Sequence, residues 1–167
     1  MARMQRLLTN VFGQWFAMRR RFPEALLEEM TQAIASGERT HLGEIRFAVE
    51  SRLSPWMVLE SVDAAMRARQ VFAQLQVWDT EHNTGILFYV SMAEKRIEIV
   101  ADRGIASRVA QAEWDDICTR MRGSYASGRW REGSLAGIAA AHALLQRHFP
   151  SDGTENPDEL PDRPVLL

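Results

Sequence analysis

The stretch ILFYVSMAEKRIEIVADRG, residues 86–104, decides the fold of this chain. Residues 86–92 are apolar at nearly every position, which is typical of a strand buried on both faces of a sheet. Residues 96–100 alternate apolar and charged side chains, as a strand with one buried face does. A short connection, residues 93–95, separates the two. The pattern therefore predicts a β-hairpin whose apolar strand lies at the centre of the sheet.

The sequence before this hairpin predicts a further strand and a helix. Residues 45–50 alternate in the same way and are expected to form a strand with one buried face. Ser54 followed by Pro55 is typical of a helix start, so a helix is expected over about 54–76. A strand–helix–strand unit closes as a right-handed crossover with parallel strands. We therefore expect an α/β fold with a small mixed sheet of order 1-2-3, its first two strands parallel and its third antiparallel.

The rest of the sequence predicts helices on either side of the sheet in the chain, a basic N-terminal segment and an acidic C-terminal segment. Apolar residues at helical spacing predict helices over 24–36, from about 109 to 121, and 130–148, which would cover both faces of the sheet. Residues 1–22 hold five arginines and no acid, and their apolar residues predict a basic amphipathic helix over 4–22. The domain itself is expected over 23–149. Residues 150–167 are rich in proline and acids, which predicts an acidic disordered tail.

The composition is that of an ordinary globular protein. The net charge is −2 and hydrophobic residues make up 46% of the chain. Cys118 is the single cysteine, so no disulfide can form within the chain. No apolar run is long enough to cross a membrane, and the N-terminus does not resemble a signal peptide. We therefore expect a cytoplasmic protein, with residues 4–22 as a candidate contact to the inner face of the membrane. The alternative is that this helix folds back on the domain and is stabilised by packing there.

Polar residues should gather at one edge of the predicted sheet. The first two strands begin there and the third ends there, which brings together His41, Gly43, Glu44, Asp79, Glu81, His82, Asn83, Gly85, Asp102, Arg103 and Gly104. Oxygen ligands from separate loops suit Ca²⁺ or Mg²⁺, so Asp79, Asn83 and Asp102 are the candidate metal ligands. The structural alternative is that Asp79 caps a turn and Asp102 pairs with Arg103 at the end of a strand.

Other chemistry finds less support in the sequence. His82 is expected to be exposed in a loop, His142 to be a hydrogen-bonded interior histidine, and Cys118 to be inert packing. The glycine-rich phosphate-binding motifs are absent, so no nucleotide cofactor is expected. Arginines do not alternate with stacking aromatics across the core, so nucleic-acid binding is not expected either. No catalytic residue can be named.

Three segments resemble the TPM domain family. They are HLGEIRFAVESRL at 41–53, VWDTEHNTGILFYVSMAEKRIEIVADRGI at 77–105 and GRWREGSLAGI at 128–138. Within them, Asn83-x-Gly85 before an apolar strand, the hairpin, and the Asp102-Arg103-Gly104 ending are the most specific parts. The chain is similar to compact bacterial members without a signal peptide. The resemblance implies a three-layer α/β/α sandwich over about 23–149.

The resemblance also implies a range of functions. Members of the family are linked to divalent cation (calcium) binding, to phosphatase activity, and to membrane-associated assembly or repair of protein complexes. This chain departs from many of them at the hairpin turn, where Ala93, Glu94 and Lys95 replace a pair of aspartates before Arg96. We therefore expect a non-enzymatic accessory or protein-interaction domain at the cytoplasmic membrane surface that binds a divalent cation. A metal-dependent phosphatase is the alternative.

Overall fold

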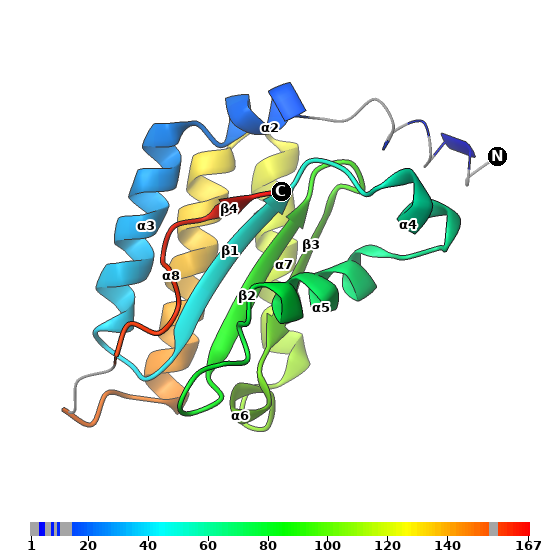
Figure 1. Cartoon of the computed structure of the whole chain (residues 1–167). Helices are drawn as coiled ribbons and strands as arrows, with labels where there is room; N and C mark the ends of the chain where they lie inside the picture. Colours follow the sequence, from blue (N-terminus) through cyan, green and yellow to red (C-terminus); the bar gives the residue numbers. More distant parts are fainter. Residues whose placement is uncertain (1–3, 6–7, 9, 11–14, 154–156) are drawn as a thin grey trace.

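The computed structural model describes residues 4, 5, 8, 10, 15–153 and 157–167. It shows a three-layer α/β/α arrangement, with a mixed sheet between helices on its two faces (Figure 1). This confirms the fold class that the sequence predicts.

The sheet has the order β3-β2-β1-β4. Strands β1 (Glu44–Glu50) and β2 (Gly85–Ser91) are parallel, with Glu44 opposite Gly85, and β3 (Arg96–Ala101) pairs antiparallel with β2. The predicted order and directions are therefore confirmed. A fourth strand that the sequence did not predict, β4 (Val165–Leu166), pairs parallel with β1.

The larger core lies between one face of the sheet and four helices. These are α2 (Trp15–Arg21), α3 (Glu24–Glu38), α7 (Gln111–Ala126) and α8 (Trp130–His148). Phe47 and Phe88 from neighbouring strands stack at 5.4 Å between ring centroids, and Phe22 packs edge-on to Tyr125. Gly137 lets α8 approach α7, because a Cβ there would lie 2.4 Å from the sulfur of Met121.

A shorter helical segment covers the other face. The predicted helix over 54–76 is wrong in one respect, because it is two helices, α4 (Pro55–Leu59) and α5 (Ala64–Gln74). Between them Ser61 has a φ of 62°, outside the helical region, and the side chain of Asp63 then caps α5 by accepting a hydrogen bond from the Met66 amide. Ala64, Ala68 and Val71 of α5 pack in the smaller core.

Residues 157–167 correct the expectation of a disordered tail. Leu160 is buried against the smaller core, and Val165–Leu166 forms the edge strand β4. As a result every residue of β1 is buried, including those expected to face water. Arg46 in β1 donates to the carbonyl oxygens of Pro161 and Arg163, which fixes the tail to the sheet.

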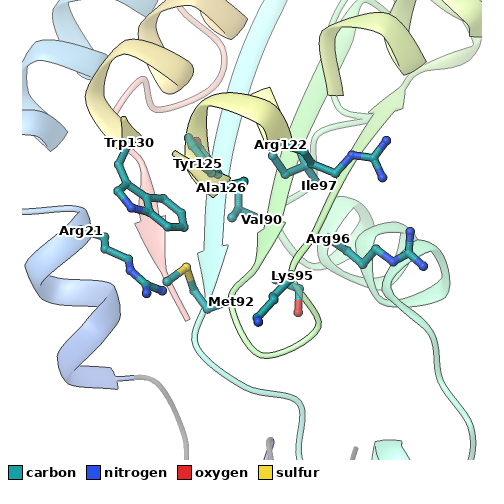
Figure 2. Close-up of a pocket in the computed structure, with 11 residues that line it drawn as sticks. Arg21, Val90, Met92, Lys95, Arg96, Ile97, Arg122, Tyr125, Ala126 and Trp130 are labelled. Carbon is teal, nitrogen blue, oxygen red and sulfur yellow. The ribbon is translucent and has the colours of Figure 1, made fainter. Parts of the chain in front are cut away.

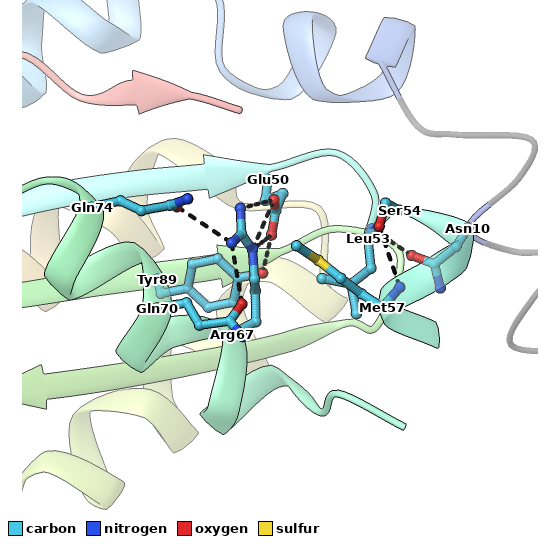
Figure 3. Close-up of polar contacts among 9 residues, drawn as sticks. All are labelled: Asn10, Glu50, Leu53, Ser54, Met57, Arg67, Gln70, Gln74 and Tyr89. Atoms are coloured by element: carbon cyan, nitrogen blue, oxygen red, sulfur yellow. Dashed lines mark hydrogen bonds and ion pairs between the residues drawn. The ribbon is translucent and has the colours of Figure 1, made fainter. Parts of the chain in front are cut away.

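The N-terminal segment is fastened to the domain where it is described. The predicted helix over 4–22 falls partly on residues outside the described part, but Met18 and Phe22 are buried in the main core. Asn10 is fully buried and accepts a hydrogen bond from the Leu53 amide at 2.7 Å (Figure 3). It also donates to Glu94 at 2.9 Å. Asn10 thereby links the segment to the start of α4 and to the β2–β3 turn.

Candidate functional site

Polar groups gather at two opposite edges of the sheet. The loop edge is where β1 and β2 begin and β3 ends, and the hairpin edge is where β1 and β2 end and the β2–β3 turn lies. At the loop edge the Asp102 amide donates to the Gly85 carbonyl oxygen at 2.9 Å, and the Gly104 amide donates to that of Asn83 at 3.1 Å. A Cβ on Gly104 would lie 2.6 Å from the Asn83 oxygen, so the close approach requires glycine.

Of the three predicted metal ligands at the loop edge, two are held together by hydrogen bonds and the third is exposed. Arg103 donates from Nε to Oδ1 of Asn83 at 3.0 Å, and the Arg103 amide donates to Oδ1 of Asp102 at 2.7 Å. Oδ2 of Asp102 is buried and has no hydrogen-bond partner among the described residues. Asp79 is exposed in the same loop, as is His82. The structure thus joins Asn83 and Asp102 through Arg103, and the metal assignment stays a prediction.

A second acidic group lies at the loop edge, and the sequence analysis missed most of it. Carboxylate oxygens of Glu38, Glu44 and Asp158 lie within 4.8 Å of one another. Glu44 accepts a hydrogen bond from the Leu160 amide at 3.4 Å, and Glu38 accepts one from the Ile45 amide at 2.6 Å. We call Glu38, Glu44, Asp158 and Asp162 the acidic cluster.

Burial and mutual repulsion shift the proton affinities of the acidic cluster. Burial, followed by the charge of Glu44, raises the pKa of Glu38 to about 10. Burial also raises the pKa of Glu44 to about 7 and that of Asp162 above its usual range. A hydrogen bond joins Glu38 to Asp162, and a neutral Glu38 carboxyl that donates to the Asp162 carboxylate adds to the raised pKa of Glu38, whereas the pKa of Asp162 is raised by burial in spite of this hydrogen bond. Without a cation, the cluster therefore holds at least one proton at neutral pH.

Sequence patterns offered little signal for this cluster. Glu44 was placed at the edge by the topology, but Asp158 and Asp162 lie in the segment expected to be disordered. Glu38 is the last residue of α3, where an exposed carboxylate is ordinary. Only the return of the tail across β1 brings the four side chains together.

Two buried histidines near the loop edge belong to the structure and not to a reactive site. The Gly43 amide donates to Nδ1 of His41, so Nε2 of His41 donates to Nδ1 of His142 at 2.7 Å, and Nε2 of His142 donates to the Ala33 carbonyl oxygen. Burial lowers the pKa of His41 to about 4 and lowers that of His142. His142 is therefore the hydrogen-bonded interior histidine that the sequence predicted. Burial likewise raises the pKa of Cys118 to about 12, which fits the expected inert thiol.

The hairpin edge holds a cavity of about 620 Å³. Figure 2 shows Arg21 and Trp130, from α2 and α8, on one side of it and Lys95 and Arg96, from the hairpin, on the other. Its apolar surface includes Met92 of the β2–β3 turn. No acid is among the described residues that line this cavity.

Exposed aromatic side chains lie at the same edge. Phe16 of α2 is 88% exposed and Trp56 of α4 is 67% exposed, and Trp15 and Leu59 beside them are also exposed. Figure 1 places α2 and α4 at the hairpin edge of the sheet, on either side of the β2–β3 turn. Arg19 lies over the ring of Trp15 at 4.5 Å. The sequence analysis identified the arginines at 19–21, but it did not predict that α4 adds an exposed tryptophan to the same edge.

These features define a mixed α/β domain with one acidic edge and one basic, aromatic edge. The sequence model of the TPM domain matches residues 21–144, most of the chain, and the chain therefore belongs to the TPM domain family. No curated protein matches the chain.

Solved structures support the same assignment. The chain is similar to the BA42 protein from the psychrophilic bacterium Bizionia argentinensis, with 27% identity and a TM-score of 0.75 over 86% of this chain and 93% of that one. It is also similar in fold to the N-terminal domain of a protein from P. gingivalis, with 18% identity and a TM-score of 0.59 over 74% and 76%. Among the described residues, no helix has the length and hydropathy to cross a membrane.

Proposed function

We propose that this protein is a non-enzymatic accessory domain that attaches to the cytoplasmic face of an anionic membrane through its hairpin edge. The observation that carries the proposal is the exposure of Phe16 and Trp56 on two separate helices at one edge. Folding normally buries such side chains, and aromatic residues that remain exposed together mark interaction surfaces. Aromatic rings are also favoured at the boundary between lipid and water.

Charge favours a membrane over an uncharged partner surface. Arg19, Arg20 and Lys95 are exposed at the hairpin edge, whereas the acidic cluster lies at the loop edge. A basic residue near an anionic bilayer contributes about 1 kcal/mol, so these side chains add to the contribution of the aromatic rings. Although the net charge of the chain is −2, this separation would turn the hairpin edge toward the membrane. The loop edge would then face the cytoplasm, where a partner protein could reach it.

Vesicle flotation tests this proposal. The full chain is expected to float with vesicles that contain phosphatidylglycerol and to stay behind with vesicles of phosphatidylcholine alone. The double variant Phe16→Ser/Trp56→Ser should lose most of the binding. The matched control is Met66→Ser/Trp78→Ser, which removes two exposed apolar side chains from α5 and from the loop after it.

Salt provides the second arm of the experiment. Added salt screens the arginines but not the aromatic contacts, so binding should weaken and not vanish. Failure of the full chain to float at low salt would contradict the membrane proposal. So would an equal loss of binding in the control variant.

Divalent cation binding at the loop edge is the second candidate property. The grouped oxygens of the acidic cluster and the unpartnered Oδ2 of Asp102 favour a hard cation there. Asp79, Asn83 and Asp102 fit such a cation only if Arg103 releases the Asn83 oxygen. The acidic cluster fits one only if Glu38 or Glu44 loses its proton, so binding there would release protons.

Calorimetric titration with Ca²⁺ and Mg²⁺ separates these two groups of ligands. If the loop residues bind, Asp79→Asn/Asp102→Asn abolishes the heat. If the acidic cluster binds, Glu44→Gln/Asp158→Asn abolishes it, and the heat depends on the ionisation enthalpy of the buffer. Absence of binding in the unaltered protein would rule out cation binding at either group.

The alternative of a metal-dependent phosphatase needs such a cation together with a positioned nucleophile. Its test is hydrolysis of an aryl phosphate. Activity that a chelator and Asp102→Asn both abolish would favour the alternative over the accessory domain. Activity that survives both would exclude this metal-dependent mechanism.

A further inference from the structure

The cavity at the hairpin edge combines positive charge with an apolar surface. Arg21 and Lys95 stand on opposite sides of Met92 (Figure 2). Met92 is 3% exposed and Ile97 is 6% exposed, so this part of the cavity belongs to the packed core and keeps its shape. Lys95 has a φ of 51°, a conformation set by the tight turn that carries it.

The charges around the cavity are not balanced by acids within it. Four cationic side chains line it, from Arg21, Lys95, Arg96 and Arg122, and no Asp or Glu does so among the described residues. Glu98 interacts with Arg96 and Arg122 from the neighbouring strand position, and Asp63 and Asp115 lie near enough to interact with Glu98, so the acids around these two arginines lie outside the cavity. Arg21 lies over the ring of Trp130 at 4.7 Å, which holds its guanidinium group at the wall of the cavity. The cavity therefore favours an anion.

The size and the lining of the cavity indicate which kind of anion it can hold. A volume of about 620 Å³ is within the range of sites for small organic ligands and exceeds what an inorganic anion fills. Guanidinium groups bind phosphate oxygens in a fork, and a lysine adds a point charge. An apolar floor beside such groups is suited to the hydrocarbon part of the same molecule. Under the proposed membrane attachment, the cavity opens at the same edge of the sheet as the exposed rings of Phe16 and Trp56, so its ligand would come from the bilayer.

We propose that this cavity binds the phosphate group of an anionic amphiphile, with Arg21 and Lys95 on the phosphate and Met92, Ile97 and Trp130 against the adjoining apolar chain. The source favoured by the exposed aromatic residues is a phospholipid of the bilayer, and to that extent the inference rests on the proposed membrane attachment. A soluble phosphate ester with an apolar group offers the same chemistry.

Decyl phosphate, kept below its micelle concentration, is the probe that isolates the cavity from the bilayer. In NMR titrations of the full chain it should shift the indole signal of Trp130 and the methyl signals of Met92 and Ile97. Decyl maltoside, which has the same chain and no charge, should not. Inorganic phosphate should bind at least about tenfold more weakly, because it makes the charged contacts but buries no hydrocarbon.

Variants assign the charge contacts. Lys95→Gln, and Arg21→Gln with Lys95→Gln, should weaken decyl phosphate binding by about tenfold or more, which is the usual effect of losing a hydrogen bond to a charged group. Arg21→Lys should retain part of the binding because it keeps the charge. The matched control is Arg39→Gln/Arg69→Gln, which removes two exposed arginines far from the cavity and should leave binding unchanged. Lys95 is exposed, so its variant should keep the fold.

The outcomes test the proposed ligand of the cavity separately from the proposed membrane attachment. Equal binding of decyl maltoside, equal binding of inorganic phosphate, or unchanged affinity in Lys95→Gln and the double variant would overturn the assignment of the cavity. Decyl phosphate binding by a protein that does not float with vesicles would support the cavity as a site for a soluble ester and contradict membrane attachment. Loss of both decyl phosphate binding and flotation in the double variant alone would identify the phospholipid as the ligand.

Discussion

The contribution of Glu38 to the stability of the fold depends on whether its buried carboxyl group is protonated. Its Oε1 accepts a hydrogen bond from the Ile45 amide, and a second hydrogen bond joins it to Asp162. Burial raises its pKa from 4.5 to about 10, so the folded protein binds a proton here that the unfolded chain releases. The stabilisation from this group is complete below pH 4.5. It declines as the pH rises from 4.5 toward 10.

Replacement by glutamine should remove this dependence on pH. In Glu38→Gln the amide can still accept from Ile45 and donate to Asp162, and it has no proton to lose. With a chelator present, the free energy of unfolding of the variant should match that of the unaltered protein near pH 5 and exceed it by several kcal/mol at pH 9. Urea denaturation at the two pH values measures the difference.

A control for this prediction is Glu28→Gln, which changes an exposed carboxylate on the same helix. It should shift stability by less than about 0.5 kcal/mol at either pH. A Glu38→Gln variant that is no more stable than the unaltered protein at pH 9 would show that Glu38 is ionised in the fold.

The ion pair of Glu50 and Arg67 joins β1 to α5. Arg67 donates from Nη2 to Glu50 at 2.7 Å, and Tyr89 of β2 donates its hydroxyl to the same carboxylate (Figure 3). Both ionic side chains are more than nine-tenths buried. Removal of one partner leaves a charge in the interior, which costs far more than the pair itself contributes.

Arg67→Met should therefore destabilise the fold by about 3–5 kcal/mol. Glu50→Gln/Arg67→Met should cost less than Arg67→Met alone, because the second change removes the buried charge. Denaturant midpoints of the two variants test this order. A double variant that is less stable than Arg67→Met would mean that the carboxylate of Glu50 is satisfied without its arginine.

The tail behaves as an element of the fold through Leu160 and β4. Leu160 is 5% exposed and packs with Ala48 and Val71 under the second face of the sheet. Leu160→Ala should cost about 2–3 kcal/mol, and Leu167→Ala, at the partly exposed end of the same segment, should change stability by less than about 0.5 kcal/mol. Equal, negligible effects would show that the tail does not pack on β1 in solution.

The sequence predicted those elements whose pattern of apolar and polar residues matches the burial of their side chains in the fold. Residues 86–92 are apolar at every position except Ser91 because β2 is buried on both faces, and residues 96–100 alternate because β3 is only partly buried. The tail was missed because its prolines and acids indicate little to bury. Its partners are Arg46, which the alternation of residues 45–50 placed on an exposed face, and Glu44, which the topology placed at the loop edge.

At the scale of the whole molecule, one candidate site could be predicted from the sequence and two could not. Strand direction alone was enough to predict that Asn83 and Asp102 meet at the loop edge. The acidic cluster and the cavity at the hairpin edge could not be predicted, because each combines residues from segments far apart in the sequence whose packing no local pattern reveals. The cavity is an example, since Arg21 of α2, Lys95 of the hairpin and Trp130 of α8 line it together.

The five tryptophans allow the most direct measurement of how the whole molecule meets a membrane. Trp15 and Trp56 lie at the hairpin edge, Trp78 is 49% exposed near the loop edge, and Trp114 is buried. Indole NMR signals recorded with anionic bicelles that carry a spin-labelled lipid report which of them approach the bilayer. Broadening of Trp15 and Trp56, with Trp78 and Trp114 unaffected, is the result that attachment through the hairpin edge predicts. Broadening of Trp78 as strong as that of Trp56, or no broadening of any of them, would contradict it.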